Sequence, residues 1–111
     1  MRNFYTTVLE RMREHDADFD TEPYEAGWAA EAMYFIRIHE IAGSDARLAS
    51  RVQVSVDGID WIDEGTAFPP LDKPGSYCVK VRHFGGWLRL HSEIAGANPR
   101  LSVTIQLALK E

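Results

Sequence analysis

The chain has 111 residues, of which 45% are hydrophobic and 26% are charged, and its formal net charge at pH 7 is -5. This length and composition are typical of one globular domain, and the acidic balance argues against binding along a nucleic-acid backbone, which needs a basic surface. The single cysteine excludes an intrachain disulfide and a multi-cysteine zinc site.

Targeting signals are missing from the sequence pattern. Residues 1–7 contain no apolar stretch of the kind that forms a signal peptide. No apolar run in the chain approaches the roughly 18 residues of a membrane span. We therefore expect a cytoplasmic or virion-associated protein that is not secreted through a signal peptide and has no membrane partner.

The first element, over residues 4–12, has a mixed pattern. Tyr5, Val8 and Met12 recur at helical spacing, which favours a helix. The run Tyr5-Thr6-Thr7-Val8 is rich in residues that favour strands. A strand is the preferred prediction because the rest of the chain reads as strands, and a helix and a disordered arm stay open.

The next segment concentrates the negative charge. Residues 10–25 carry seven acids and two bases, whereas the other 95 residues carry ten of each. Such a segment is either a solvated connector or an arm that docks on a basic surface. We therefore divide the chain into residues 1–25, an arm or edge strand with an acidic connector, and residues 26–111, a single β-sandwich domain. The candidate arm residues are Asp16, Asp18, Asp20 and Glu22.

The middle of the chain alternates with the period of two that is typical of strands. Residues 32–41 predict one strand, and Gly43-Ser44-Asp45 predicts a break after it. Residues 51–56 predict a second strand with its valines, Val56 included, facing inward. Asp57-Gly58 suits a tight hairpin turn, so the strand is expected to resume over residues 59–62 and to include Trp61.

The remaining strands lie in the second half of the chain. Residues 66–75 contain three prolines, which predict a loop or a sheet edge. Residues 77–84 and 87–94 flank Gly85-Gly86 and predict a hairpin, and a turn is expected at residues 96–100. Residues 101–110 alternate without interruption, so this strand has one buried face. The sum is an all-β chain, an antiparallel β-sandwich or jelly-roll-like fold of six to eight strands with an N-terminal acidic arm.

The hairpin at Gly85-Gly86 predicts a surface of positive charge. If the turn has two residues, four side chains share one face, and Arg82 lies directly opposite Arg89. Like charges in that position destabilise a sheet, so the acids of residues 10–25, from the same chain or from a neighbour, are candidates to neutralise them; solvated arginines are the simpler alternative. The candidate interaction stripe comprises Lys80, Arg82, Arg89 and His91.

No catalytic constellation emerges from the sequence. None of the four histidines accompanies a serine in a nucleophile-elbow motif, and His83 reads as a hydrogen-bonded histidine of the core or its rim. The acids at positions 57, 60, 63 and 64 could suit calcium, but their spacing does not match a calcium-binding loop. Cys78 reads as a buried strand cysteine. We therefore predict no catalytic residue, no metal site and no cofactor.

The aromatic residues suggest a second class of function. Exposed aromatic rings stack on sugars, and β-sandwiches present such rings, although packing in the core is the simpler explanation for tryptophans in strands. The aromatics considered are Trp28, Trp61, Tyr77, Phe84 and Trp87, of which Trp28 and Trp61 are the candidates for sugar stacking.

Several stretches of the chain resemble a known group of proteins. The pattern V-x-V-S-x-D-G-x-x-W over residues 52–61 is followed by FGGWLRL at 84–90, IAGANP at 94–99 and a terminal strand that ends in LKE. Over about residues 28–111 the chain is similar to small β-sandwich structural and accessory proteins of tailed phages and prophages. The S-x-D-G-x-x-W part also occurs in discoidin-like and sugar-binding sandwiches. The resemblance implies a structural role without catalysis and assigns no functional residues.

The sequence therefore predicts a module that is not an enzyme. Its leading function is to self-assemble, as a homo-oligomer, or to dock on a larger protein assembly of the virion-accessory kind, with protein as its partner. The alternative is a carbohydrate-binding module that uses exposed tryptophans.

Overall fold

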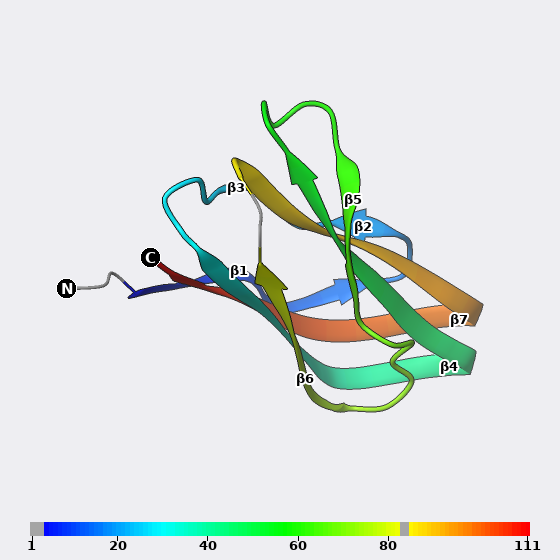
Figure 1. Ribbon diagram of the computed structural model, residues 1–111. Coiled ribbons are helices and arrows are strands. Elements are labelled where there is room, and N and C mark those ends of the chain that lie inside the picture. The colour runs from blue at the N-terminus through cyan, green and yellow to red at the C-terminus, as the bar shows by residue number, and fades with distance from the viewer. Residues whose placement is uncertain (1–3, 83–84) are drawn as a thin grey trace.

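The computed structural model describes residues 4–82 and 85–111. These residues form antiparallel strands and no helix, so none of them belongs to a helix that could cross a membrane. The all-β, antiparallel prediction is confirmed (Figure 1). The strands are β1 (Phe4–His15), β2 (Phe19–Asp20), β3 (Tyr24–Glu25), β4 (Glu31–Ser55), β5 (Ile62–Ala67), β6 (Gly75–Arg82) and β7 (Trp87–Lys110).

Two long strands, β4 and β7, organise the fold. They pair with each other along their length, run to one end of the molecule, bend there and return (Figure 1). Residues 31–42 of β4 and 101–110 of β7 form one layer with β1 and β6, which we call the β6 layer. Residues 47–55 of β4 and 87–95 of β7 form the other with β2, β3 and β5, which we call the β5 layer. One continuous sheet thus folds over itself into a sandwich.

A glycine in each long strand makes this bend possible. Gly43 in β4 has a φ of 114°, and a Cβ there would lie 2.9 Å from the carbonyl oxygen of Ala97. Gly96 in β7 has a φ of 120°, and a Cβ there would lie 2.8 Å from the Cα of Ala46. The sequence predicts a break at both places. The structure instead has bends in continuous strands, because glycine tolerates positive φ while the ladder continues on either side.

The core lies between the two layers. The apolar positions of residues 101–110 are buried, as their alternation predicts, and so is the face of β4 that carries Tyr34, Ile36 and Ile38. Side chains of the β5 layer meet them from the other side, and Phe68 and Leu71, from the loop that follows β5, belong to the same core. The largest side chains that are almost wholly buried are Tyr34, Ile36, Ile38, Leu48, Leu88, Leu90, Leu101, Ile105, Leu107 and Leu109.

Tyr34 places a hydroxyl in this core. Its Oη has no hydrogen-bond partner among the described residues, and burial raises the pKa of the phenol well above its usual range. An unpaired buried hydroxyl disfavours folding because it has lost its hydrogen bonds to water. We expect Tyr34→Phe to leave the free energy of unfolding unchanged or to raise it by about 1 kcal/mol. Urea denaturation measures this, and a clear loss of stability would show that the hydroxyl is hydrogen-bonded in the folded protein.

The two predicted hairpin turns differ from the structure. β4 ends at Ser55 and β5 begins at Ile62, so Trp61 precedes the strand and the two-residue turn is a longer loop. Ser55 is buried and Val56 is exposed, the reverse of the prediction, because the alternation ends where the loop begins. No hairpin forms across Gly85-Gly86, since β6 pairs with β4 in one layer whereas β7 enters the other.

Candidate interaction surfaces

The four residues of the predicted stripe lie on two different layers. Lys80 and Arg82 are on β6, whereas Arg89 and His91 are on the half of β7 in the β5 layer. In the actual pairing Arg82 lies opposite Glu31, and its Nη2 is 3.7 Å from the Glu31 carboxylate. The four residues therefore do not form one stripe, and the predicted clash between the two arginines does not arise.

The acidic segment contacts one half of that set within the same chain. The Asp20 carboxylate accepts a hydrogen bond from His91 Nδ1 at 2.6 Å and lies 3.6 Å from Arg89 Nη1. Asp18 accepts the backbone N–H of Ile94 at 2.8 Å. These contacts hold β2 on the edge of β7, so this part of the acidic segment is an edge of the β5 layer. The other two candidate arm residues, Asp16 and Glu22, are exposed.

A polar network continues from Arg89 across the outer face of the β5 layer. Arg89 Nε donates to Gln53 Oε1 at 2.8 Å, and Gln53 Nε2 donates to Asp63 at 3.0 Å. Arg51 bridges Asp63 and Glu93 at 3.0 Å each. The Asp63 carboxyl accepts hydrogen bonds from Gln53 and Arg51, which lower its pKa. Opposite charges therefore satisfy one another on this face, and it carries little unpaired charge.

The outer face of the β6 layer has a different character. Phe4 and Val8 on β1 and Phe35 on β4 are exposed, and Met33 beside them is half-buried. Cys78 on β6, expected to be buried, is also exposed on this face, opposite Phe35. Apolar side chains on β1, β4 and β6 thus lie on this face without a covering layer among the described residues.

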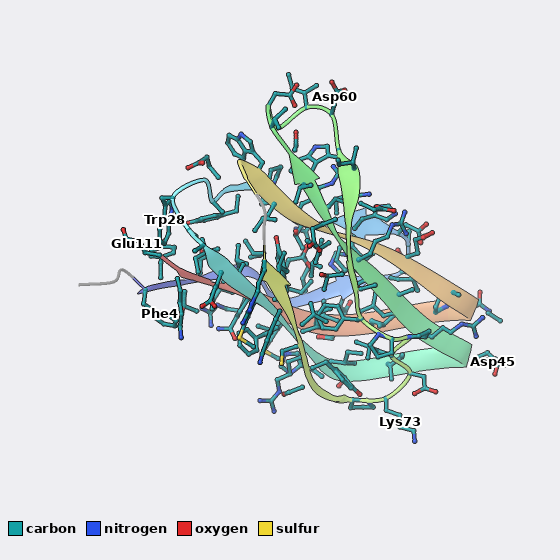
Figure 2. The ribbon with its side chains drawn as sticks, in the orientation of Figure 1. Phe4, Trp28, Asp45, Asp60, Lys73 and Glu111 are labelled. Carbon is teal, nitrogen blue, oxygen red and sulfur yellow. The ribbon has the colours of Figure 1, made fainter. Side chains whose placement is uncertain are left out.

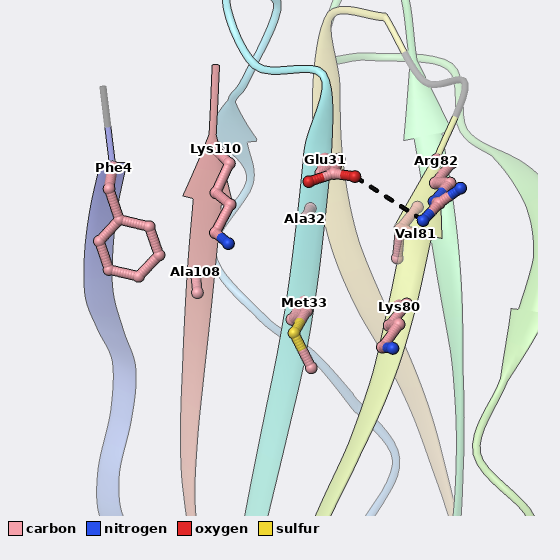
Figure 3. Close-up of a pocket in the computed structure, with 9 residues that line it drawn as sticks. All are labelled: Phe4, Glu31, Ala32, Met33, Lys80, Val81, Arg82, Ala108 and Lys110. Carbon is pink, nitrogen blue, oxygen red and sulfur yellow. Dashed lines mark ion pairs between the residues drawn. The ribbon is translucent and has the colours of Figure 1, made fainter. Parts of the chain in front are cut away.

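A hollow of about 240 Å³ lies on this face, at the end where the strands begin and finish (Figure 3). Phe4, Met33 and Ala108 contribute apolar surface, and Lys80, Arg82 and Lys110 contribute positive charge. Glu31 is the acid among its lining residues. We call this the basic hollow. It contains Lys80 and Arg82, the half of the predicted stripe that the acidic segment does not reach.

The loop between β4 and β5 carries the other group of exposed apolar side chains. Val56, Ile59 and Ile62 are 91%, 78% and 66% exposed, respectively. The loop is ordered by hydrogen bonds: Asp57 Oδ1 accepts the backbone N–H groups of Ile59 at 2.9 Å and Asp60 at 3.0 Å. The loop projects from one end of the molecule (Figure 2). We call residues 56–62 the apolar loop.

The order of the apolar loop should depend on pH. The backbone hydrogen bonds from Ile59 and Asp60, followed by the one from Ser55, hold the pKa of Asp57 below its usual range. Because its pKa is lower in the folded protein, the ionised Asp57 carboxylate stabilises the loop at pH values above its unfolded-state pKa of about 3.9. This contribution is lost as the pH falls through the folded-state pKa. We expect the protection of the Ile59 and Asp60 amides, measured as the exchange rate relative to its intrinsic value, to fall below about pH 4.

Asp57→Asn provides the control for this acid effect. Asparagine keeps a carbonyl acceptor at the same place and does not titrate. Its loop should show no acid-dependent step in amide exchange at Ile59 and Asp60. The same step in Asp57→Asn would mean that another group controls the loop.

An aromatic cluster lies at the start of the chain. Tyr5 and Tyr24 are stacked with their ring centroids 6.1 Å apart, and burial, followed by a hydrogen bond with Tyr5, raises the pKa of Tyr24. These rings line a hollow of about 370 Å³ together with Phe4 and Trp28. Trp28, a candidate for sugar stacking, is 40% exposed. Trp61, the other candidate, is half-buried, and the Arg89 guanidinium lies 4.4 Å from its ring centroid.

The remaining candidates for chemistry have local structural roles. His15 Nε2 contacts Glu10, and His39 Nε2 contacts Thr104 Oγ1 at 2.8 Å. His83 and Phe84 lie outside the described residues. Nowhere within residues 4–82 and 85–111 do three or more histidine, cysteine or acidic side chains gather as metal ligands.

Sequence reasoning missed two of these surfaces. It did not single out Val56, Ile59 and Ile62, because the predicted hairpin placed Val56 on the inward face of one strand and the two isoleucines in the next strand. It also missed the aromatic cluster, whose members come from β1, β3 and the segment after β3 and meet only through the fold.

No protein-family model matches the sequence, and no curated protein is similar to it at a significant level. Several solved structures share the fold. The SPBc2 prophage-derived protein YomS is similar over 100% of this chain and 96% of its own, with a TM-score of 0.57 and 9% sequence identity. The VP2 subviral particle of infectious bursal disease virus is similar over 98% of this chain, with a TM-score of 0.63 and 10% identity, although the match spans 32% of that chain.

A third structure belongs to a different class of protein. It is the CBM36-1 domain of a multidomain xylanase from the hindgut metagenome of Trinervitermes trinervoides, similar over 96% of both chains with a TM-score of 0.54 and 9% identity. Identities this low show a shared fold. The resemblance to prophage proteins is thus supported by fold, and the comparisons include viral and prophage proteins beside a domain of a xylanase.

Proposed function

We propose that the protein is a non-catalytic structural module that self-assembles or docks on a larger protein assembly. The observation that carries this proposal is the contrast between its two outer faces. Charges on the β5 layer are paired by the network around Arg89, Asp63 and Arg51. The β6 layer instead exposes Phe4 and Phe35 beside cations. Exposed apolar patches with a polar rim are typical of surfaces that bind another protein.

The fold similarities support the same proposal. A subviral particle is a protein assembly, and the VP2 protein that forms it shares this fold. A prophage-derived protein shares it over nearly its whole length. A role as a virion-associated or cytoplasmic assembly component fits both similarities.

The test is the mass in solution, measured by light scattering over a range of concentrations at low and high salt. We expect an oligomer that weakens as salt rises, because salt screens the attraction between exposed charges. An oligomer that does not respond to salt would place the contact on apolar surface alone. A monomer under every condition would reject self-assembly. Docking on a different protein would then be the part of the proposal to test next.

Carbohydrate binding is the second candidate, and the aromatic cluster favours it. The hollow bounded by Phe4, Tyr5, Tyr24 and Trp28 presents ring surfaces of the kind that pack against the apolar faces of sugars. Trp28 is the better candidate for stacking, because the Arg89 guanidinium covers part of the Trp61 ring.

Tryptophan fluorescence titrated with a panel of glycans tests this candidate. If it holds, a glycan changes the emission of the native protein and of Trp61→Phe, and the change disappears in Trp28→Ala. No response to any glycan, or an equal response in Trp28→Ala, would reject a sugar site at the aromatic cluster.

A further inference from the structure

We propose that the apolar loop of one copy docks into the basic hollow of a second copy, so that the protein assembles head to tail. This inference rests on the proposed self-assembly and specifies which surfaces meet. Both surfaces are on the same chain. The apolar loop presents aliphatic side chains beside acids, and the basic hollow presents apolar surface beside cations.

The apolar loop is built to contact something outside its own chain. Burying an aliphatic side chain favours folding by roughly 1.5–3 kcal/mol, yet Val56, Ile59 and Ile62 are left largely exposed. The loop is nevertheless held in one shape, because Ser55 Oγ accepts the backbone N–H of Gly58 at 2.8 Å and Asp57 fixes the next two amides. A loop that is already ordered loses little conformational entropy on binding.

The basic hollow has the size and lining to receive such side chains. Its volume of about 240 Å³ is below the roughly 300–1,000 Å³ of small-molecule pockets. Its surface combines the apolar groups of Phe4, Met33 and Ala108 with surrounding cations (Figure 3). A few aliphatic side chains on a narrow loop would bury this surface while the cations remain at the rim.

The charges of the two surfaces are complementary. The apolar loop carries acids at positions 57 and 60, whereas the basic hollow has three cations and one acid. Within the described parts of the chain, neither the Asp60 carboxylate nor the Lys80 ammonium has an ion-pair partner. Opposite charges across an interface fix its orientation and speed association.

The two surfaces cannot meet within one chain. The apolar loop extends from the β5 layer, and the basic hollow lies on the outer face of the β6 layer, which faces away from the β5 layer (Figures 1 and 3). The occupant is therefore a second copy. Because the joined surfaces differ, the contact is heterologous and leads to a ring if the rotation closes or to a filament if it does not.

Two variants and their mixture test this arrangement. Ile59→Asp changes the apolar loop, and Lys80→Glu with Arg82→Glu reverses the charge of the basic hollow. All three side chains are exposed, so the fold should survive. Each variant alone should associate at least about tenfold more weakly than the native protein. Mixed in equal amounts, they should form a one-to-one heterodimer, because each retains the surface that the other has lost.

The control is Arg47→Glu with Arg100→Glu, which makes the same change in net charge on exposed residues away from both surfaces. It should assemble like the native protein. Native-like assembly by both test variants would overturn the head-to-tail contact and leave self-assembly standing. Weakened variants that do not form the heterodimer on mixing would also overturn it. A native protein that is monomeric throughout would overturn both the contact and self-assembly.

Discussion

Gly96→Ala is expected to destabilise the protein by about 2–5 kcal/mol, from backbone strain and overpacking together. The substitution adds a Cβ at a φ of 120° and places it 2.8 Å from the Cα of Ala46. Neither strand can retreat easily, because β4 and β7 are paired on both sides of the bend. A domain of this size has only about 5–15 kcal/mol of stability in total. The melting temperature should therefore fall by roughly 10–20 °C.

Gly65→Ala separates the two causes of this loss. Gly65 also has a positive φ, 115°, but a Cβ there would meet no atom within 4 Å. Gly65→Ala should show the backbone strain alone, about 1–3 kcal/mol. The difference between the two melting temperatures then reports the close approach of the strands at the bend. Equal losses for the two variants would show that contact between β4 and β7 is not what limits this position.

Ile105→Ala should destabilise the protein by about 2–5 kcal/mol through the cavity that it leaves. Ile105 is fully buried on β7, lies opposite Ile36 of β4 and is paired with Glu10 of β1 on its other side. It therefore sits where three strands contribute to the core. Urea denaturation should show a lower midpoint with an unchanged slope, because the surface exposed on unfolding is nearly the same.

Gln106→Ala is the matched control on the neighbouring position of the same strand. Gln106 faces outward between Phe35 and Val8 and is half-exposed. Its loss should change the free energy of unfolding by no more than about 0.5 kcal/mol. If both variants lost the same stability, the assignment of the inward and outward faces of β7 would be wrong.

Strand content and strand faces could be predicted from the sequence because they are local properties. Residues 101–110 alternate between apolar and polar side chains, and a strand places successive side chains on opposite faces. The same reasoning predicts a strand over residues 32–41, and these residues lie within β4. The acidic segment was also visible as composition, although its contact with β7 through Asp20 and Asp18 was not.

Strand pairing was decided by the tertiary structure. Gly85-Gly86 permits a tight hairpin, and the local pattern is equally consistent with a crossing between layers. The crossing occurs because β6 pairs with residues 31–38, which lie some 45 residues earlier in the chain. The glycines at 43 and 96 look like loop residues until the close approach of β4 and β7 is known.

The candidate surfaces were also determined partly by the sequence and partly by the tertiary structure. Lys80, Arg82, Arg89 and His91 could be identified from their alternation as cations or potential cations that point out of the core, but only the pairing of distant strands shows that they belong to two faces. Their partners, Glu31 and Asp20, come from elements far away in the sequence. The sequence thus determined a chain of strands with alternating side chains and a concentration of negative charge in residues 10–25. The tertiary structure decided which charges are neutralised and which apolar residues stay exposed, because both depend on contacts between residues distant along the chain.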